Sequence, residues 1–111
     1  MDTYDFLVQG SAAEPYRITV SWRDMGKLSA FCSCPAGENG TFCKHRVQIL
    51  RGSTEGIVSK NQADVAIVAG WLAGTDVERA LRTVDELELE AERIKKALIS
   101  AKKVLSRSLL D

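Results

Sequence analysis

The chain has 111 residues, enough for one modest domain with an appendage, so any hydrophobic core is expected to be thin. Fifteen basic and fifteen acidic residues cancel, which argues against a protein that coats nucleic acid through its overall charge. Hydrophobic residues make up 45% and charged residues 27%, values that indicate a folded globular chain. The longest nearly apolar stretch, 65–73, is about half a bilayer span, and the first residues lack a secretion-signal pattern. We therefore expect a soluble, cytoplasmic protein with no membrane partner.

The first third of the chain shows the alternation of β-strands. Apolar and polar residues alternate over 4–9 and, more clearly, over 17–23 and 28–32. Residues 10–15 are typical of a connection, and residues 23–27 carry a turn signal. These patterns predict a small antiparallel sheet of about three strands.

Helical patterns follow the strands. The apolar residues of 47–50 predict a short helix that stops near Gly52. A second helical segment, capped by Ser59 or Asn61, is expected to extend to Gly74. The fold class is therefore α+β, a small sheet followed by a helical hairpin with a long last helix. We expect one domain at 1–58 and a helical tail for dimerisation or other interactions at 59–111.

The last helix is predicted to be long and coiled-coil-like. Residues 75–78 form a capping box that opens it, and no Gly or Pro interrupts 75–111. Its apolar residues recur at alternating spacings of three and four over more than four heptads. At about 1.5 Å per residue the helix is on the order of 50 Å long, too long to bury this stripe against a small sheet. We expect the stripe to mediate dimerisation through Val84, Leu87, Ile94, Leu98 and Leu105.

Charge is segregated along the same helix. Residues 76–92 hold seven acidic and two basic residues, whereas residues 93–111 hold six basic and one acidic. This polarity complements the helix dipole, which by itself explains it. It also sets opposite charges together when two copies pair antiparallel, and like charges together when they pair in parallel. We expect an antiparallel homodimer; the alternative is a helix that folds back on residues 62–72 of its own chain.

All three cysteines and the only histidine fall within fourteen positions. Cys32 and Cys34 form a C-x-C pair, and after eight residues Cys43 and His45 form a C-x-H pair. The strand period puts the first two sulfurs on one face, and the glycines and proline between the pairs let the chain reverse. Three sulfurs and one imidazole complete a tetrahedral zinc shell. The alternatives are a disulfide with one free thiol, and a reactive cysteine.

The segment of roughly residues 4–52 resembles the SWIM zinc finger. That family has C-x-C, a variable spacer and C-x-H on a strand-strand-helix frame, usually with a proline after the second cysteine and a lysine inside C-x-H. Pro35 and Lys44 match those positions. The resemblance implies Zn²⁺ binding by Cys32, Cys34, Cys43 and His45, and it implies a module that binds DNA or protein. Because four protein ligands close the shell, we expect a structural zinc and no enzymatic activity.

The candidate partners follow from charge and from the apolar helix. Basic side chains on the predicted strand 17–23 and beside the metal ligands form a local candidate DNA site: Arg17, Arg23, Lys44 and Arg46. A solvated sheet face without a ligand is the alternative. Phe31 and Phe42 flank the ligands and are expected to shield the metal from water. We predict a zinc module that binds a macromolecule, with DNA slightly favoured; the alternative is a protein-interaction adaptor that binds no nucleic acid.

Overall fold

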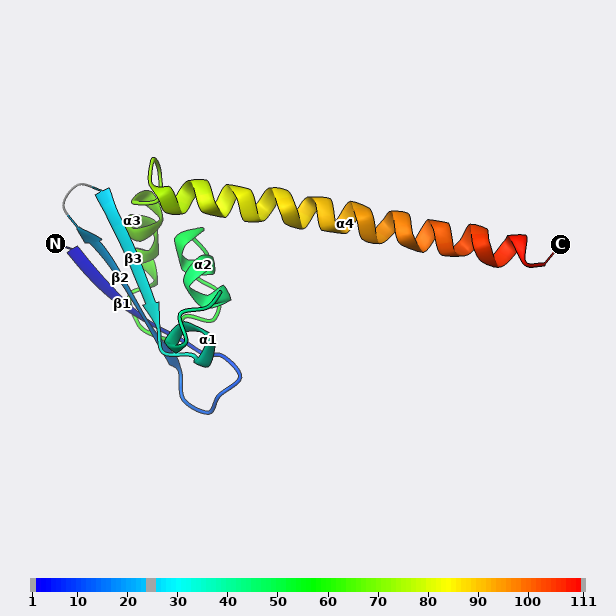
Figure 1. The fold of residues 1–111 in the computed structure, drawn as a ribbon. Helices are drawn as coiled ribbons and strands as arrows, with labels where there is room; N and C mark the ends of the chain where they lie inside the picture. The colour runs from blue at the N-terminus through cyan, green and yellow to red at the C-terminus, as the bar shows by residue number, and fades with distance from the viewer. Residues whose placement is uncertain (1, 24–25, 111) are drawn as a thin grey trace. The chain divides into compact units, whose positions relative to one another are not determined.

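The computed structural model describes residues 2–23 and 26–110 and confirms the α+β fold class (Figure 1). The chain divides into two compact units, Met1–Val77 and Glu78–Asp111, called here the first and second unit. In chain order the elements are β1 (Asp2–Val8), β2 (Tyr16–Arg23), β3 (Lys27–Cys32), α1 (Pro35–Glu38), α2 (Lys44–Leu50), η2 (Gln62–Asp64), α3 (Val65–Gly70) and α4 (Asp76–Ser108).

The first unit is built on an antiparallel sheet in the order β1-β2-β3. Phe6 pairs with Ile18, and Ile18 pairs with Cys32, so these side chains form one row across the sheet. The predicted strands are confirmed, with ends shifted by one or two residues. The predicted turn at 23–27 includes residues 24 and 25, which lie outside the described residues.

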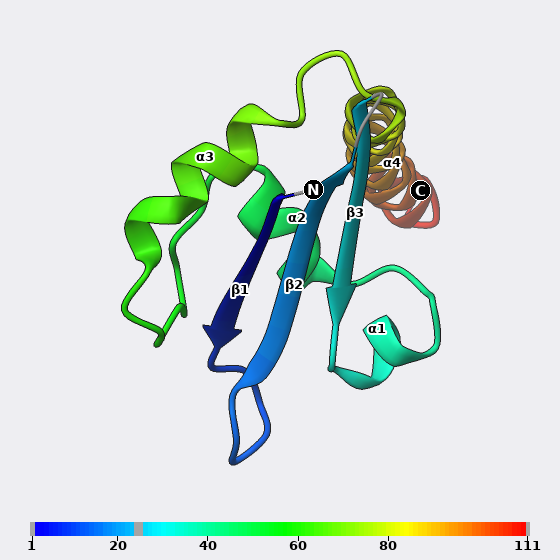
Figure 2. The same cartoon turned by 90° about the vertical axis from the view of Figure 1, so that its left-hand side faces the viewer.

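The inner face of the sheet carries the hydrophobic core. Phe6, Ile18 and Val20 are completely buried there, together with side chains from α2 and α3. Figure 2 looks onto the sheet, with α2 behind it. Because strand side chains alternate between faces, the neighbouring residues of β2 and β3 point to the opposite, outer face. Those residues are polar for the most part and are exposed or half-buried.

The outer edge of β1 is covered by a later segment of the chain. The backbone N–H of Val58 donates to the carbonyl of Leu7 at 2.8 Å, and the N–H of Gln9 donates to the carbonyl of Gly56 at 2.8 Å. Ile57 is buried beside this bridge. The edge of β1 is therefore satisfied by backbone partners at this end of the strand.

The helical segment predicted to extend to Gly74 is shorter in the structure. A 3₁₀ turn precedes α3, and α3 ends at Gly70 because glycine disfavours the helix interior. Its Val65 and Val68 belong to the same core as the sheet, and Trp71 packs against that core. That residues 1–58 fold as a separate domain stays a prediction.

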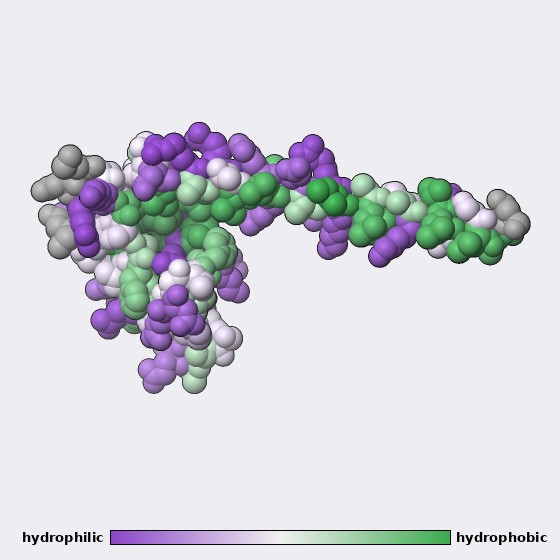
Figure 3. Space-filling model, in the orientation of Figure 1, coloured by the Kyte–Doolittle hydropathy of each residue, from purple (hydrophilic) through white to green (hydrophobic). Residues whose placement is uncertain are grey.

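α4 forms as predicted, directly after Thr75, and runs without a break for 33 residues. None of its residues is buried, and Ile94, at its centre, is 62% exposed. Figure 3 shows apolar residues along its length, interleaved with hydrophilic ones. Coiled-coil pairing of this helix stays a prediction. Among the described residues, no helix has both the length and the apolar character needed to cross a membrane.

Candidate metal centre

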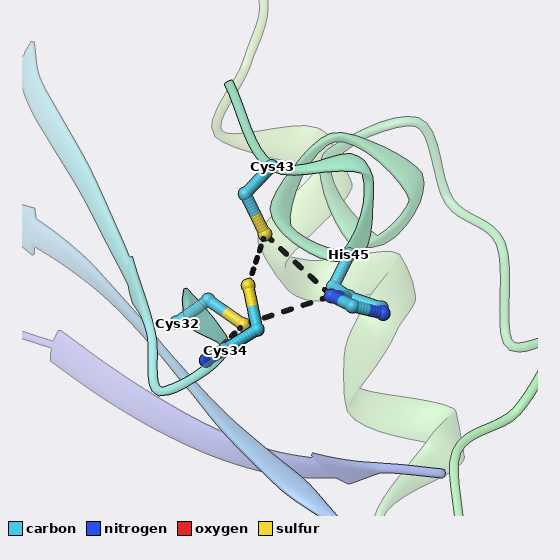
Figure 4. Close-up of side chains that lie close together, drawn as sticks. All are labelled: Cys32, Cys34, Cys43 and His45. Atoms are coloured by element: carbon cyan, nitrogen blue, oxygen red, sulfur yellow. Dashed lines mark hydrogen bonds between the residues drawn. The ribbon is translucent and has the colours of Figure 1, made fainter. Parts of the chain in front are cut away.

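Three elements bring the predicted ligands together (Figure 4). Cys32 is the last residue of β3, and Cys34 directly precedes α1 as its N-cap. Cys43 is the N-cap of α2, and His45 lies in the first turn of that helix, as the sequence predicted. One atom from each of the four side chains lies within 4.8 Å of all the others. The structure therefore gathers both halves of the motif at one point.

The distances between these atoms fit a tetrahedral metal site. The sulfurs of Cys34 and Cys43 are 3.4 Å apart, and His45 Nδ1 lies 3.6 Å from Cys43 Sγ and 3.9 Å from Cys32 Sγ. Zinc bonds of about 2.3 Å to sulfur and about 2.0 Å to nitrogen place tetrahedral ligand atoms about 3.5–3.8 Å apart. A disulfide needs about 2.0 Å between sulfurs, and all three cysteines are free. The geometry favours a metal over a disulfide.

Backbone N–H groups hold two of the sulfurs. The N–H of Cys34 donates to Cys32 Sγ at 3.5 Å, and the N–H of Gly37 donates to Cys34 Sγ at 3.3 Å. The second contact exists because α1 packs tightly against the end of β3. A Cβ at Gly37 would lie 2.2 Å from the carbonyl oxygen of Cys32, so only glycine fits. α1 was not predicted from the sequence, because four residues are too few to show helical periodicity.

Burial opposes ionisation at this site, and the hydrogen bonds partly offset it. Burial raises the pKa of the Cys32 thiol to about 12. Burial also acts to raise the pKa of Cys43, but hydrogen bonds led by the backbone N–H of Arg46 bring that pKa below its usual value. The pKa of His45 is lowered by burial and by the charge of Lys44, which favours the neutral imidazole that binds metals.

His45 is oriented by two residues outside the predicted ligand set, Tyr16 and Gly10. Its Nδ1 faces the sulfurs, and its ring lies 5.2 Å from the ring of Tyr16, centroid to centroid. A Cβ at Gly10 would lie 2.6 Å from the Tyr16 ring and 3.4 Å from His45 Nε2, so this side of the imidazole has no room for a side chain. The sequence did contain a signal for the position of Tyr16, because the alternation of β2 puts Tyr16 on the same face as the buried Ile18.

The four predicted DNA-binding residues do not form one patch. Arg17 and Arg23 lie on the outer face of the sheet, at opposite ends of β2. Lys44 and Arg46 belong to α2, which packs on the inner face. The side chain of Arg46 has a structural role, because its guanidinium donates hydrogen bonds to the carbonyls of Thr41 at 2.6 Å and Ala30 at 3.2 Å.

The two phenylalanines beside the ligands do not share the role expected for them. Phe31 is 49% exposed and alternates with Cys32 along β3, so it points to the outer face and does not shield the metal. Phe42 is also exposed, but it lines the same hollow as Cys34, Cys43 and His45.

Comparison with known families agrees with this geometry. Residues 6–50 match the family model of the SWIM zinc finger, a span that includes most of the sheet, the ligands and α2. Neither a curated protein nor a solved structure matches the chain significantly. The match covers less than half of the chain and does not include residues 51–111. Residues 6–50 therefore match the SWIM zinc finger in sequence, and the structure places Cys32, Cys34, Cys43 and His45 as a set of ligands for a metal ion, consistent with Zn²⁺.

Proposed function

We propose that this chain is a non-enzymatic zinc module that binds DNA through the outer face of its sheet and self-associates through α4. The zinc finger indicates the general role, a zinc-binding module for interaction with other macromolecules. The three thiols must stay reduced to hold the metal, which favours the cytoplasm as the compartment.

The donor set supports a structural metal. Three thiolates and one imidazole supply four ligands, so a tetrahedral zinc keeps no position for an activated water. The sequence has a single histidine, and that residue belongs to the donor set. Without an open metal position or a second imidazole, the centre has neither a zinc-bound nucleophile nor a histidine base.

The observation that carries the DNA proposal is a pair of cations on the outer sheet face. Arg17 and Arg23 are six residues apart on β2, so their Cα atoms are about 20 Å apart. Lys27 pairs with Arg23 across the strands and adds a third cation at that end. Neither arginine forms an ion pair with any described residue. These charges are thus available to phosphates, the groups that dominate DNA affinity.

The centre of the same face is not basic. Thr19 donates a hydrogen bond to the carboxylate of Asp5, and Thr19 pairs with Phe31 on the next strand. The cationic ends of this face, at Arg17 and at Arg23, favour contacts with DNA phosphates. Between them, the Asp5 carboxylate can accept hydrogen bonds from bases, and the exposed ring of Phe31 can stack on a base. Zinc contributes indirectly, because Cys32 ties the end of β3 to the metal.

The test is fluorescence anisotropy of labelled DNA with the zinc-loaded full chain. Arg17→Gln combined with Arg23→Gln is expected to weaken binding and to reduce the slope of log K against log [salt] by about 2. The matched control removes two cations elsewhere, with Lys96→Gln and Lys103→Gln on α4, and is expected to retain the salt slope. Equal losses in both variants would contradict the sheet-face site, and no DNA binding by the parent chain would contradict the DNA function.

A protein-interaction adaptor is the second candidate, and α4 favours it. The helix exposes several large apolar side chains, including Leu87, Leu98 and Leu105, and such a surface is typical of protein contacts. If the parent chain binds neither single-stranded nor duplex DNA, this function replaces the first. Self-association is common to both candidates, because another copy of α4 is one partner that would cover these side chains.

A further inference from the structure

The apolar seam of α4 is symmetric about one point. With Val84 as an a position, the a and d positions between residues 80 and 105 hold an alanine followed by two larger apolar residues, and this order repeats: Ala80, Val84, Leu87, Ala91, Ile94, Leu98, Ala101 and Leu105. The midpoint of this series falls between Glu92 and Arg93. Reversing the helix about that midpoint places every a position opposite a d position, as antiparallel packing requires. A large residue then faces a small one, except at Leu87 and Leu98, which face each other.

The charge of α4 changes sign at the same midpoint. The acidic residues concentrate before it and the basic residues after it, so the reversal lays each acidic half beside a basic half. Seam periodicity and charge are separate properties of the sequence, and the helix dipole explains only the second. Their common centre is the observation that points to a partner, because a second copy of the same helix, reversed about that centre, carries the matching pattern.

We propose that two copies of the chain pair through α4 in antiparallel orientation, with a two-fold axis between Glu92 and Arg93. This inference rests on the proposed self-association and on the antiparallel orientation expected from the sequence, and it adds the register. The interface contains Leu87 against Leu98 of the second copy and Ala91 against Ile94 of the second copy, each contact occurring twice by symmetry. Leu87, Ile94 and Leu98 are each more than half exposed in the single chain, so pairing removes their apolar surface from water.

The charged residues beside the seam distinguish this register from a parallel pair. In the antiparallel register the e positions face each other, which puts Glu88 opposite Lys95 of the second copy. In a parallel pair the g position of one helix faces the next e position of the other, which puts Glu90 opposite Lys95 instead. Glu88 and Glu90 are both exposed on α4. A change at Glu88 therefore tests the antiparallel pair, and a change at Glu90 tests the parallel pair.

The experiment is sedimentation equilibrium of the zinc-loaded full chain at low salt, comparing Glu88→Lys with Glu90→Lys. Each variant replaces one negative charge on α4 with one positive charge, and the two positions are only two residues apart. Glu88→Lys sets like charges together at two places and is expected to weaken the dimer about tenfold. Glu90→Lys faces Ala97 in the proposed register and is expected to have a much smaller effect. Adding Lys95→Glu to Glu88→Lys restores opposite charges and is expected to restore the dimer.

The outcomes separate the register from self-association itself. A dimer that is weakened by Glu90→Lys and not by Glu88→Lys would overturn the antiparallel register while leaving self-association intact. A dimer that the swap of Glu88 and Lys95 fails to rescue would also overturn the register. A parent chain that stays monomeric at tens of micromolar would overturn self-association and the register together.

Discussion

The two units of this chain reach order by different means. Among its described residues, the first unit buries twelve apolar side chains in one core, and four potential zinc ligands gather at the end of its last strand. The second unit consists mostly of α4, and none of the described residues of that helix is buried. A small sheet can be completed by a metal within one chain, whereas a long helix with an apolar seam needs a surface outside itself. Changes to the metal site and changes to the seam should therefore have separable effects.

Removal of zinc is expected to have the largest effect, and only on the first unit. Binding and folding are coupled at such sites, so a chelator should unfold the sheet while α4 keeps helical signal. Both tryptophans, Trp22 and Trp71, lie in the first unit and contact each other at 6.0 Å between ring centroids. Near-ultraviolet circular dichroism should thus collapse while far-ultraviolet helical signal persists. Added Zn²⁺ should reverse the change and Mg²⁺ should not; an unchanged near-ultraviolet spectrum after complete zinc removal would contradict the coupling.

Gly37→Ala is expected to have the next largest effect, because the new methyl group would overlap the carbonyl oxygen of Cys32. Relief requires backbone movement at the metal site, which we expect to cost about 2–4 kcal/mol of unfolding free energy and to weaken zinc binding. Gly70→Ala is the matched control, since a Cβ there meets nothing within 4 Å. Urea denaturation followed by tryptophan fluorescence measures both variants. Equal stability of the two variants would show that α1 does not pack against Cys32 as described.

Leu98→Asp addresses the second unit. A charge in the apolar seam is expected to weaken self-association by about 2 kcal/mol, about thirtyfold, with no change in zinc content. Leu89→Asp is the control, because Leu89 is 67% exposed on the same helix but lies outside the seam. Sedimentation equilibrium gives the association constants. If both variants dissociate alike, the interaction does not follow the seam.

Arg46→Met is expected to have the smallest effect of the set. It removes the two hydrogen bonds to the carbonyls of Thr41 and Ala30, which we expect to cost about 1–2 kcal/mol of unfolding free energy. Lys44→Met removes the same charge from the same helix at an exposed position and is expected to cost less. Thermal unfolding of the two variants compares them directly. A larger loss in Lys44→Met would indicate that the charge matters more than the hydrogen bonds of Arg46.

The parts of the site that the sequence predicted are those carried by local patterns. Strand alternation placed Cys32 on the inner face, and the C-x-H pair at the start of an apolar helix placed Cys43 and His45. The parts that were missed depend on contacts between distant segments. Tyr16 meets His45 only because β2 pairs with β3, and Arg46 reaches Ala30 only after α2 packs on the sheet.

The same limit applies to the candidate DNA site. Its four basic residues are separated in the structure because two lie on β2 and two on α2, and the sheet lies between them. A count of charges along the sequence cannot show which face of a sheet each one occupies. The position of the Phe31 side chain on the outer face follows from strand alternation once Cys32 is placed on the inner face. That position could therefore have been predicted from the sequence.

The metal site is tested most directly by the zinc content of the reduced, folded protein, measured by elemental analysis together with the protein concentration. We expect one zinc per chain, retained after gel filtration and lost in a variant that carries Cys34→Ser. A well-folded chain that holds less than about a tenth of an equivalent under the same conditions would contradict it, because a structural tetrahedral site binds its metal stoichiometrically.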